Sequence, residues 1–266
     1  MSALSLIGCA VLGACAAPGS TSEPTSEPTS GSTSGPTSEP AISPPLSEPF
    51  RVLLLGDSIS IGYTPVVEEL LAGRAHVVRP RNKGKDGVVQ GGGPENCAGT
   101  TKGSAQVDRW LGIEGGDWDV IHFNFGLHDL KRVQPGSGKN SNDRDHPHQA
   151  DPDRYRAQLQ SITRRLKATG ARLVFATTTP VPEGDLRPYR EAADSVEYNL
   201  VASAVMAEEG VPVNDLFAFV TNYPEPILRE ANVHFTGEGS RALGERVANA
   251  ILAAAGHGVA VHPAVP

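Results

Sequence analysis

The stretch Leu53-Leu54-Leu55-Gly56-Asp57-Ser58-Ile59-Ser60 decides the fold. A run of apolar residues leads directly into Gly-Asp-Ser, which is typical of a buried parallel strand ending in a tight turn. Because open α/β sheets bind their ligands at the carboxyl edge of the strands, we expect Ser58 to lie there. A serine in that position can act as a nucleophile if a histidine reaches it from elsewhere in the chain. His234, within Asn232-Val233-His234-Phe235-Thr236, is the candidate.

Strand and helix signals alternate from Phe50 to about Ala255. Thr64-Pro65 predicts the start of a first helix, and Asp151-Pro152 the start of another that ends at Gly170. Further helices are expected around Trp110, over Tyr189–Glu209 and after Thr236. The alternation predicts an α/β three-layer sandwich, with a flavodoxin-like parallel sheet covered by helices on both faces. Its expected strands are Arg51–Leu55, Ala75–Arg79, Val120–Phe125, Arg172–Thr177 and Val211–Val213.

The residues before Phe50 differ from the rest, because they contain no aromatic side chain and no Lys or Arg. Residues 1–14 form a short apolar segment, as in a signal peptide. Leu12-Gly13-Ala14-Cys15 resembles a bacterial lipobox, which predicts cleavage before Cys15 and its lipidation. Leu6-Ile7-Gly8-Cys9 fits that pattern less well, and a plain signal peptide is the alternative.

Residues 18–48 repeat Thr-Ser-Glu-Pro with Gly-Ser variants, which predicts that residues 15–49 are the lipidated cysteine and a disordered tether. We therefore expect a folded domain over residues 50–258 and a C-terminal tail over residues 259–266. This order of segments predicts an exported protein of the cell envelope, lipid-anchored outside the cytoplasmic membrane or secreted. The net charge of −7 has no block of like charge, which argues against nucleic acid as a partner.

Two loops interrupt the alternation, at residues 81–100 and 131–151. Long loops at the carboxyl ends of strands are where such folds carry their functional residues. The second loop contains side chains that could bind a metal ion, but a solvated loop of this composition is commoner, so we expect no metal site. The side chains in question are those of Asp143, Asp145, His146, His148 and Asp151.

The order of three short blocks resembles that of the SGNH (GDSL-like) hydrolase superfamily over residues 50–255. The blocks are Gly-Asp-Ser at 56–58, Gly-x-x-Asp at 126–129 and His-Phe-Thr at 234–236. The resemblance implies that Ser58 is the nucleophile, that His234 is its base, and that no cofactor is needed. It also implies an oxyanion hole formed by the backbone N–H of Ser58 and of a glycine after the second strand. Gly99 fits that glycine best, with Gly84 and Gly87 as rivals.

The third block departs from the family pattern, because His128 stands where the family carries the Asn of its oxyanion hole. A neutral imidazole still has one N–H, so the donor role becomes dependent on tautomer or pH. The alternative is a structural histidine of the loop. We expect Asp57 of the first block and Asp129 of the third to support the site.

The last block also departs, because Ala231 stands where the family carries the Asp that orients the base. Glu230 and Asn232 flank this position and are the candidates to orient His234. A Ser-His dyad without a third member is the alternative.

The resemblance implies a serine esterase that works through an acyl-enzyme. Because the loops are polar and no apolar lid helix is evident, we favour short acyl groups, such as acetyl on carbohydrate. An O-acyltransferase and a catalytically degenerate carbohydrate-binding lipoprotein are the alternatives. We expect a monomer that binds a small-molecule or glycan ester, binds no nucleic acid, and meets a membrane only through its lipid.

Overall fold

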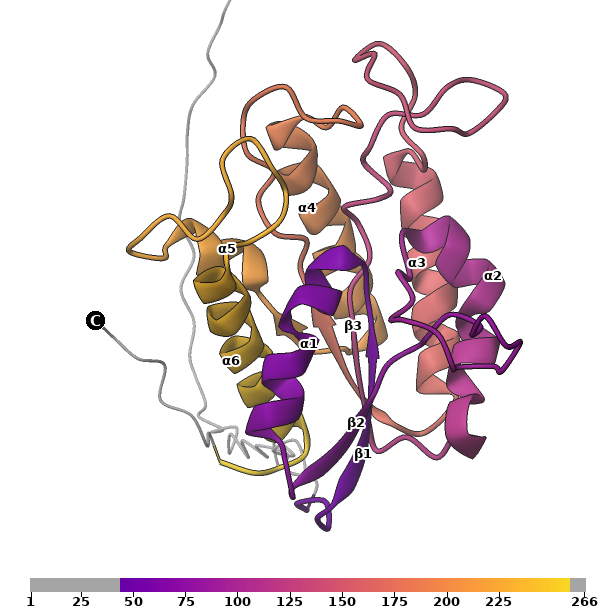
Figure 1. The fold of residues 1–266 in the computed structure, drawn as a ribbon, viewed down its shortest axis with the longest axis vertical. Helices are drawn as coiled ribbons and strands as arrows, with labels where there is room; N and C mark the ends of the chain where they lie inside the picture. The colour runs from indigo at the N-terminus through magenta and orange to yellow at the C-terminus, as the bar shows by residue number, and fades with distance from the viewer. Residues whose placement is uncertain (1–43, 259–266) are drawn as a thin grey trace, which may run out of the picture. The chain divides into compact units, whose positions relative to one another are not determined.

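The computed structural model describes residues 44–258 (Figure 1). The predicted signal peptide, the lipidation site at Cys15, most of the tether and the C-terminal tail lie outside these residues. Part of the segment assigned to the tether contacts the domain, since the Leu46 N–H donates to the Ala255 carbonyl at 2.8 Å. None of the helices between residues 44 and 258 has both the length and the apolar character needed to cross a membrane.

The strands form one parallel sheet in the order β2-β1-β3-β4-β5. Leu55 of β1 pairs with Phe123 of β3, and Phe123 pairs with Phe175 of β4, so these strands end level at one edge of the sheet. Their side chains are buried on both faces, which explains their nearly continuous apolar sequences. The strands are β1 (Phe50–Leu55), β2 (Ala75–Val78), β3 (Val120–Phe123), β4 (Arg172–Ala176) and β5 (Val213–Asn214).

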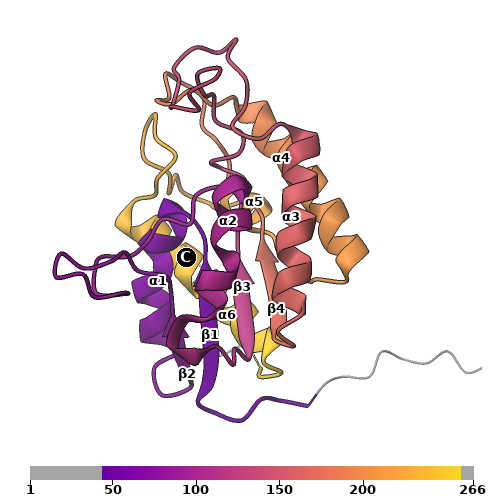
Figure 2. The same ribbon diagram turned by 90° about the vertical axis from the view of Figure 1, so that its right-hand side faces the viewer.

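Helices cover both faces of this sheet (Figures 1 and 2). On one face α1 (Ser58–Leu70) packs against α6 (Gly237–Ala254). On the other face α3 (Pro152–Lys167) packs between two helices, α2 (Thr100–Leu111) and α4 (Ala192–Glu209). This layering and the strand order confirm the predicted flavodoxin-like three-layer sandwich. Sequence reasoning did not anticipate the short helix α5 (Leu216–Thr221) or the 3-10 turn η1 (Ile113–Gly115).

The first helix begins at Ser58, so the predicted start at Thr64 was wrong. The Asp57 carboxylate caps the helix, because its Oδ1 accepts a hydrogen bond from the Ile59 N–H at 2.9 Å. Pro65 therefore lies inside the helix rather than at its first position. The helix start places the backbone N–H of Ser58 in the first turn, where no carbonyl of the same helix can accept from it.

Candidate active site

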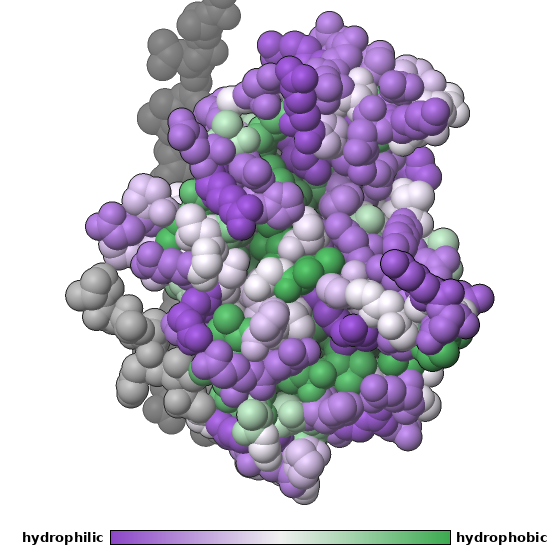
Figure 3. All heavy atoms as spheres, in the orientation of Figure 1, coloured by the Kyte–Doolittle hydropathy of each residue, from purple (hydrophilic) through white to green (hydrophobic). Residues whose placement is uncertain are grey.

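The carboxyl ends of the strands point toward the long loops at the top of Figure 1. Hydrophilic residues cover most of this end of the molecule in the face that Figure 3 shows. A cavity of about 550 Å³ opens among these loops, and Ser58, His128 and His234 all line it. Residues that are far apart in the sequence thus meet at the edge of the sheet where the nucleophile was expected.

Ser58 and His234 contact each other directly, with 2.9 Å between the serine Oγ and the histidine Nε2. Ser58 is held by the turn after β1, and His234 by the loop that leads into α6. That loop is fixed at Thr236, whose side chain caps α6 by accepting from the Gly239 N–H at 3.0 Å. The pairing has the geometry that a serine nucleophile and its base require.

Asn232 orients the His234 ring. Its Oδ1 lies 2.7 Å from His234 Nδ1 and also accepts from the backbone N–H of His234 at 3.0 Å. A backbone N–H can only donate, so the atom that faces it must be the amide oxygen. The amide oxygen in turn can only accept, so Nδ1 carries the ring proton. The lone pair of Nε2 is therefore free to accept a hydrogen bond from the Ser58 hydroxyl.

Of the two residues proposed to orient the base, the structure brings only Asn232 to His234. Glu230 is exposed and makes no hydrogen bond to the ring. Ala231 lines the cavity with a φ of 44°, in the left-handed region, and it has no polar side chain to offer. A neutral amide thus fixes the tautomer of the base without placing a negative charge beside it.

Gly99 lies at the start of α2, in the loop that follows β2. A Cβ on Gly99 would come within 2.7 Å of the Asp129 carboxylate oxygens, so only glycine fits. The neighbouring Cys97 N–H donates to the Gly56 carbonyl at 3.1 Å, which ties this loop to the turn that carries Ser58. The Gly99 N–H has no acceptor among residues 44–258.

The rival glycines have their N–H groups occupied elsewhere. Gly84 N–H donates to the Val88 carbonyl at 2.8 Å, and Gly87 N–H donates to the Gly84 carbonyl at 2.9 Å. Both bonds lie within one turn of the loop after β2. Of the three candidate glycines, Gly99 is therefore the one whose N–H has no acceptor within residues 44–258.

Asp129 stabilises the loop that carries Gly99. Its Oδ1 accepts from the Thr100 N–H at 2.8 Å and from the Thr100 hydroxyl at 2.6 Å. The carboxyl is fully buried, and burial raises the pKa of Asp129 to about 7. Asp57 is also buried and caps α1, and burial raises its pKa. Both acids act on backbone position rather than on the cavity.

His128 faces the cavity with its ring orientation set by Lys131. The Lys131 Nζ lies 3.4 Å from His128 Nδ1, which is long for a hydrogen bond, but its direction is fixed because an ammonium can only donate. Nδ1 must therefore hold a lone pair, and the ring proton sits on Nε2. Nε2 has no partner within residues 44–258.

Burial, together with the neighbouring cations, lowers the pKa of His128 to about 3. The ring is therefore neutral at physiological pH. The expected sensitivity of this position to pH near neutrality was wrong, because the sequence does not show how deeply the ring is buried or that Lys131 lies beside it.

The two histidines of the 131–151 loop contact different parts of the structure. His146 Nδ1 contacts the Ser141 hydroxyl at 2.7 Å, whereas His148 Nε2 contacts Asp194 on α4 at 3.0 Å. Among the residues that the structure describes, no three His, Cys, Asp or Glu side chains gather as a metal site would require. These contacts fasten the loop, which in turn carries Lys131 into the cavity.

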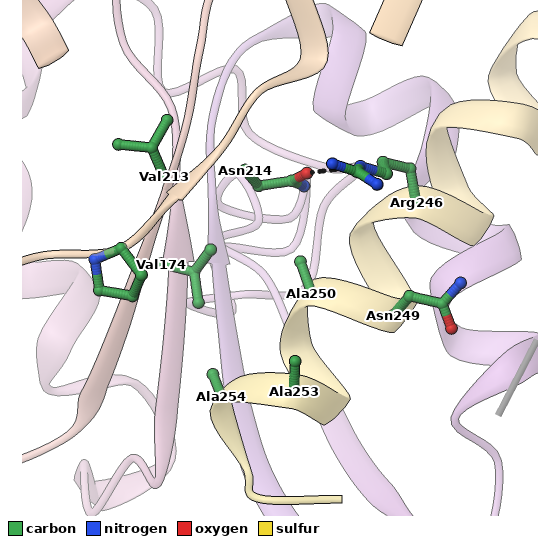
Figure 4. Close-up of a pocket in the computed structure, with 9 residues that line it drawn as sticks. Val174, Val213, Asn214, Arg246, Asn249, Ala250, Ala253 and Ala254 are labelled. Atoms are coloured by element: carbon green, nitrogen blue, oxygen red, sulfur yellow. Dashed lines mark hydrogen bonds between the residues drawn. The ribbon is translucent and has the colours of Figure 1, made fainter. Parts of the chain in front are cut away.

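A second hollow, of about 420 Å³, lies between the β4–β5 edge and α6 (Figure 4). Arg246 Nε donates to Asn214 Oδ1 at 3.1 Å across it, and alanines of α6 form much of its wall. None of the predicted site residues lines this hollow.

Sequence reasoning missed the two buried cations of the catalytic cavity, Lys131 and Arg190. Neither belongs to a family block. The one available signal was the placement of Lys131 at the start of a long loop that follows a strand end. Arg190 had none, because its segment is brought back to the cavity only by the tertiary fold.

A profile of the GDSL-like Lipase/Acylhydrolase family matches residues 54–242. This match covers more than half of the chain, so the protein belongs to that family and to the serine hydrolases that act on ester bonds. No curated protein matches the sequence significantly.

Solved structures share the fold at low sequence identity. A lipase/acylhydrolase from Enterococcus faecalis superposes with a TM-score of 0.57 at 22% identity, covering 76% of this chain and 95% of that one. An acetyl xylan esterase, AlAXEase, gives a TM-score of 0.54 at 15% identity, covering 76% of this chain and 100% of that one. A GDSL-like lipase from Bacteroides thetaiotaomicron gives 0.57 at 14% identity, covering 80% and 93%.

Proposed function

We propose that Ser58, His234 and Asn232 hydrolyse carboxylic esters through an acyl-enzyme. The observation that carries this proposal is the continuous chain of contacts from Ser58 Oγ to His234 Nε2 and from His234 Nδ1 to Asn232. His234 takes the Ser58 proton as Oγ attacks the acyl carbon, and then gives that proton to the departing alcohol. Water enters by the same route and releases the acid.

The oxyanion of each tetrahedral intermediate would be held by three donors. These are the N–H groups of Ser58 and Gly99 and the Nε2–H of His128. The first two have no partner in the described chain, and His128 lines the same cavity as Ser58. Donors held in place before the reaction stabilise charge that develops in the transition state.

Short acyl groups on a carbohydrate alcohol fit this cavity better than long hydrocarbon chains. Charged and amide side chains make up much of its lining, including Asn96, Lys131 and Asn140. A long acyl chain needs a continuous apolar wall, whereas sugar hydroxyls need such polar partners. The acetyl xylan esterase of the same fold is a precedent for this class of substrate.

The test is hydrolysis of 4-nitrophenyl acetate, and of acetylated xylan against a long-chain aryl ester. We expect Ser58→Ala to abolish all of these activities and to stop labelling by a fluorophosphonate probe. Ser203→Ala, on the exposed face of α4, is the matched control and should behave as wild type. Retention of most activity in purified Ser58→Ala would overturn the proposal. Faster turnover of the long-chain ester would overturn its substrate class.

A further inference from the structure

The charges around the catalytic cavity contrast with those of the whole chain. The chain has a net charge of −7, but the titratable lining of the cavity includes Lys131, Arg187 and Arg190 against a single carboxylate, Asp185. The net charge of the cavity lining is opposite in sign to that of the whole chain. This requires a physical explanation, because isolated charges are costly to hold away from water.

The arginines have protein partners. Arg187 Nη2 forms an ion pair with Asp185 at 2.9 Å. Arg190 donates to the carbonyls of Leu127 at 2.9 Å and Pro188 at 3.3 Å, and the buried Asp57 carboxyl attracts it electrostatically.

Lys131 differs, because its Nζ donates to no carboxylate or carbonyl oxygen of residues 44–258, and the buried Asp129 carboxyl attracts it only electrostatically. The residue is only 8% exposed. Within residues 44–258 its one hydrogen-bond contact is His128 Nδ1, which leaves two of the three ammonium protons for another acceptor. The desolvated ammonium thus has no oxygen acceptor in contact with it inside the site.

From this geometry, and resting on the proposed esterase function, we infer that the substrate carries an anionic group that pairs with Lys131 in the catalytic cavity. The anion is a carboxylate or phosphate close to the scissile ester, on either the acyl or the alcohol part. Arg190 lines the same cavity and adds to the attraction. A glycan ester of this class would be acidic, such as an acetylated uronic acid.

The test compares each anionic ester with a neutral amide of the same shape. For the alcohol part the pair is 3-acetoxybenzoate and 3-acetoxybenzamide. For the acyl part it is mono-4-nitrophenyl glutarate and its amide, each corrected for the enzyme-free rate. We expect wild type to prefer the anion of at least one pair in kcat/KM by about 10- to 100-fold, the usual value of a hydrogen bond to a charged group.

Lys131→Gln removes the charge and should abolish that preference, whereas Lys131→Arg should keep it. Loss of the contact between Lys131 and His128 would slow hydrolysis of the anionic and the neutral ester equally. The ratio of their kcat/KM values therefore reports only on recognition of the anion. Lys139→Gln, in the same loop but outside the cavity, is the control for charge and should leave the ratio unchanged.

Absence of any preference in wild type, or an equal loss on both members in Lys131→Gln, would overturn the inference while the esterase function stands. Failure of wild type to hydrolyse any of these esters would overturn both.

Discussion

Two histidines line the catalytic cavity, and their neighbours give them opposite tautomers. At His234 the partner of Nδ1 is the amide oxygen of Asn232, which can only accept, so Nε2 is left with a lone pair for Ser58. At His128 the partner of Nδ1 is the ammonium of Lys131, which can only donate, so Nε2 is left with a proton. One ring is thereby suited to be a base and the other to be a hydrogen-bond donor.

The comparison shows that the residue type alone does not define the role. An imidazole can replace a family asparagine at His128 because a cation fixes its proton on Nε2, which leaves the ring with an N–H to donate, as an amide has. Likewise an asparagine can replace a family aspartate, because orienting the ring needs only an acceptor. What the amide lacks is the charge that would stabilise the imidazolium.

The largest effect should come from the base. We expect His234→Ala to lower turnover of 4-nitrophenyl acetate by about 10⁴- to 10⁶-fold, because nucleophile and base act as one unit. The melting temperature should change by no more than a few degrees, since the ring is only partly buried. His76→Ala, on an exposed ring of β2, is the matched control. Turnover within tenfold of wild type would remove His234 from the mechanism.

Removal of the donor histidine should cost less. His128→Ala should lower kcat by roughly 10²–10³ with little change in KM, the usual cost of one oxyanion donor. His128→Asn should recover part of the loss in kcat, because the asparagine amide supplies an N–H donor that does not change its charge with pH. A drop in melting temperature with kcat per folded molecule unchanged would instead assign His128 a structural role.

The pH profile tests the same ring separately. Burial lowers the pKa of His128 to about 3, so the ring stays neutral from about pH 5 upward. Wild type and His128→Asn should therefore have pH–kcat profiles of the same shape between pH 5 and 8. A titration in this range that disappears in the variant would mean that His128 changes charge there.

The sheet edge and the catalytic pair follow from the sequence, whereas the contacts around them depend on the tertiary fold. The blocks around Ser58 and His234 predict the sheet edge and the pairing of nucleophile and base, because strand ends and chain order constrain both. The role of Asn232 was left open against Glu230, since sequence spacing does not show which side chain turns toward the ring. Lys131 could not be assigned, because the sequence does not show that its ammonium is buried without an oxygen acceptor in contact with it.

A smaller effect is expected at the orienting amide. Asn232→Ala should lower turnover by about tenfold, which is the value of one hydrogen bond. Asn232→Asp should raise it by about the same factor at neutral pH, because a carboxylate would also stabilise the imidazolium. Parallel melting curves separate these effects from misfolding. An increase in turnover with Asn232→Ala would contradict the orienting role.

The smallest effects should come from the neighbours of Asn232. Ala231→Asp and Glu230→Gln should each change turnover by less than about threefold, because charges in exposed positions are screened by water and salt. Steady-state kinetics at low and high salt would check this. A tenfold gain in Ala231→Asp would show that a carboxylate at 231 reaches the ring after all.

The central claim, that the two rings carry their protons on opposite nitrogens, can be measured directly by ¹⁵N NMR of the histidine side chains at pH 7. His128→Asn and His234→Asn would assign the two rings by the signals that each variant removes. We predict that the tautomer of His234 carries its proton on Nδ1, that His128 is neutral with its proton on Nε2, and that Lys131→Met disturbs only His128. The same tautomer on both rings, or a charged His128, would contradict the account.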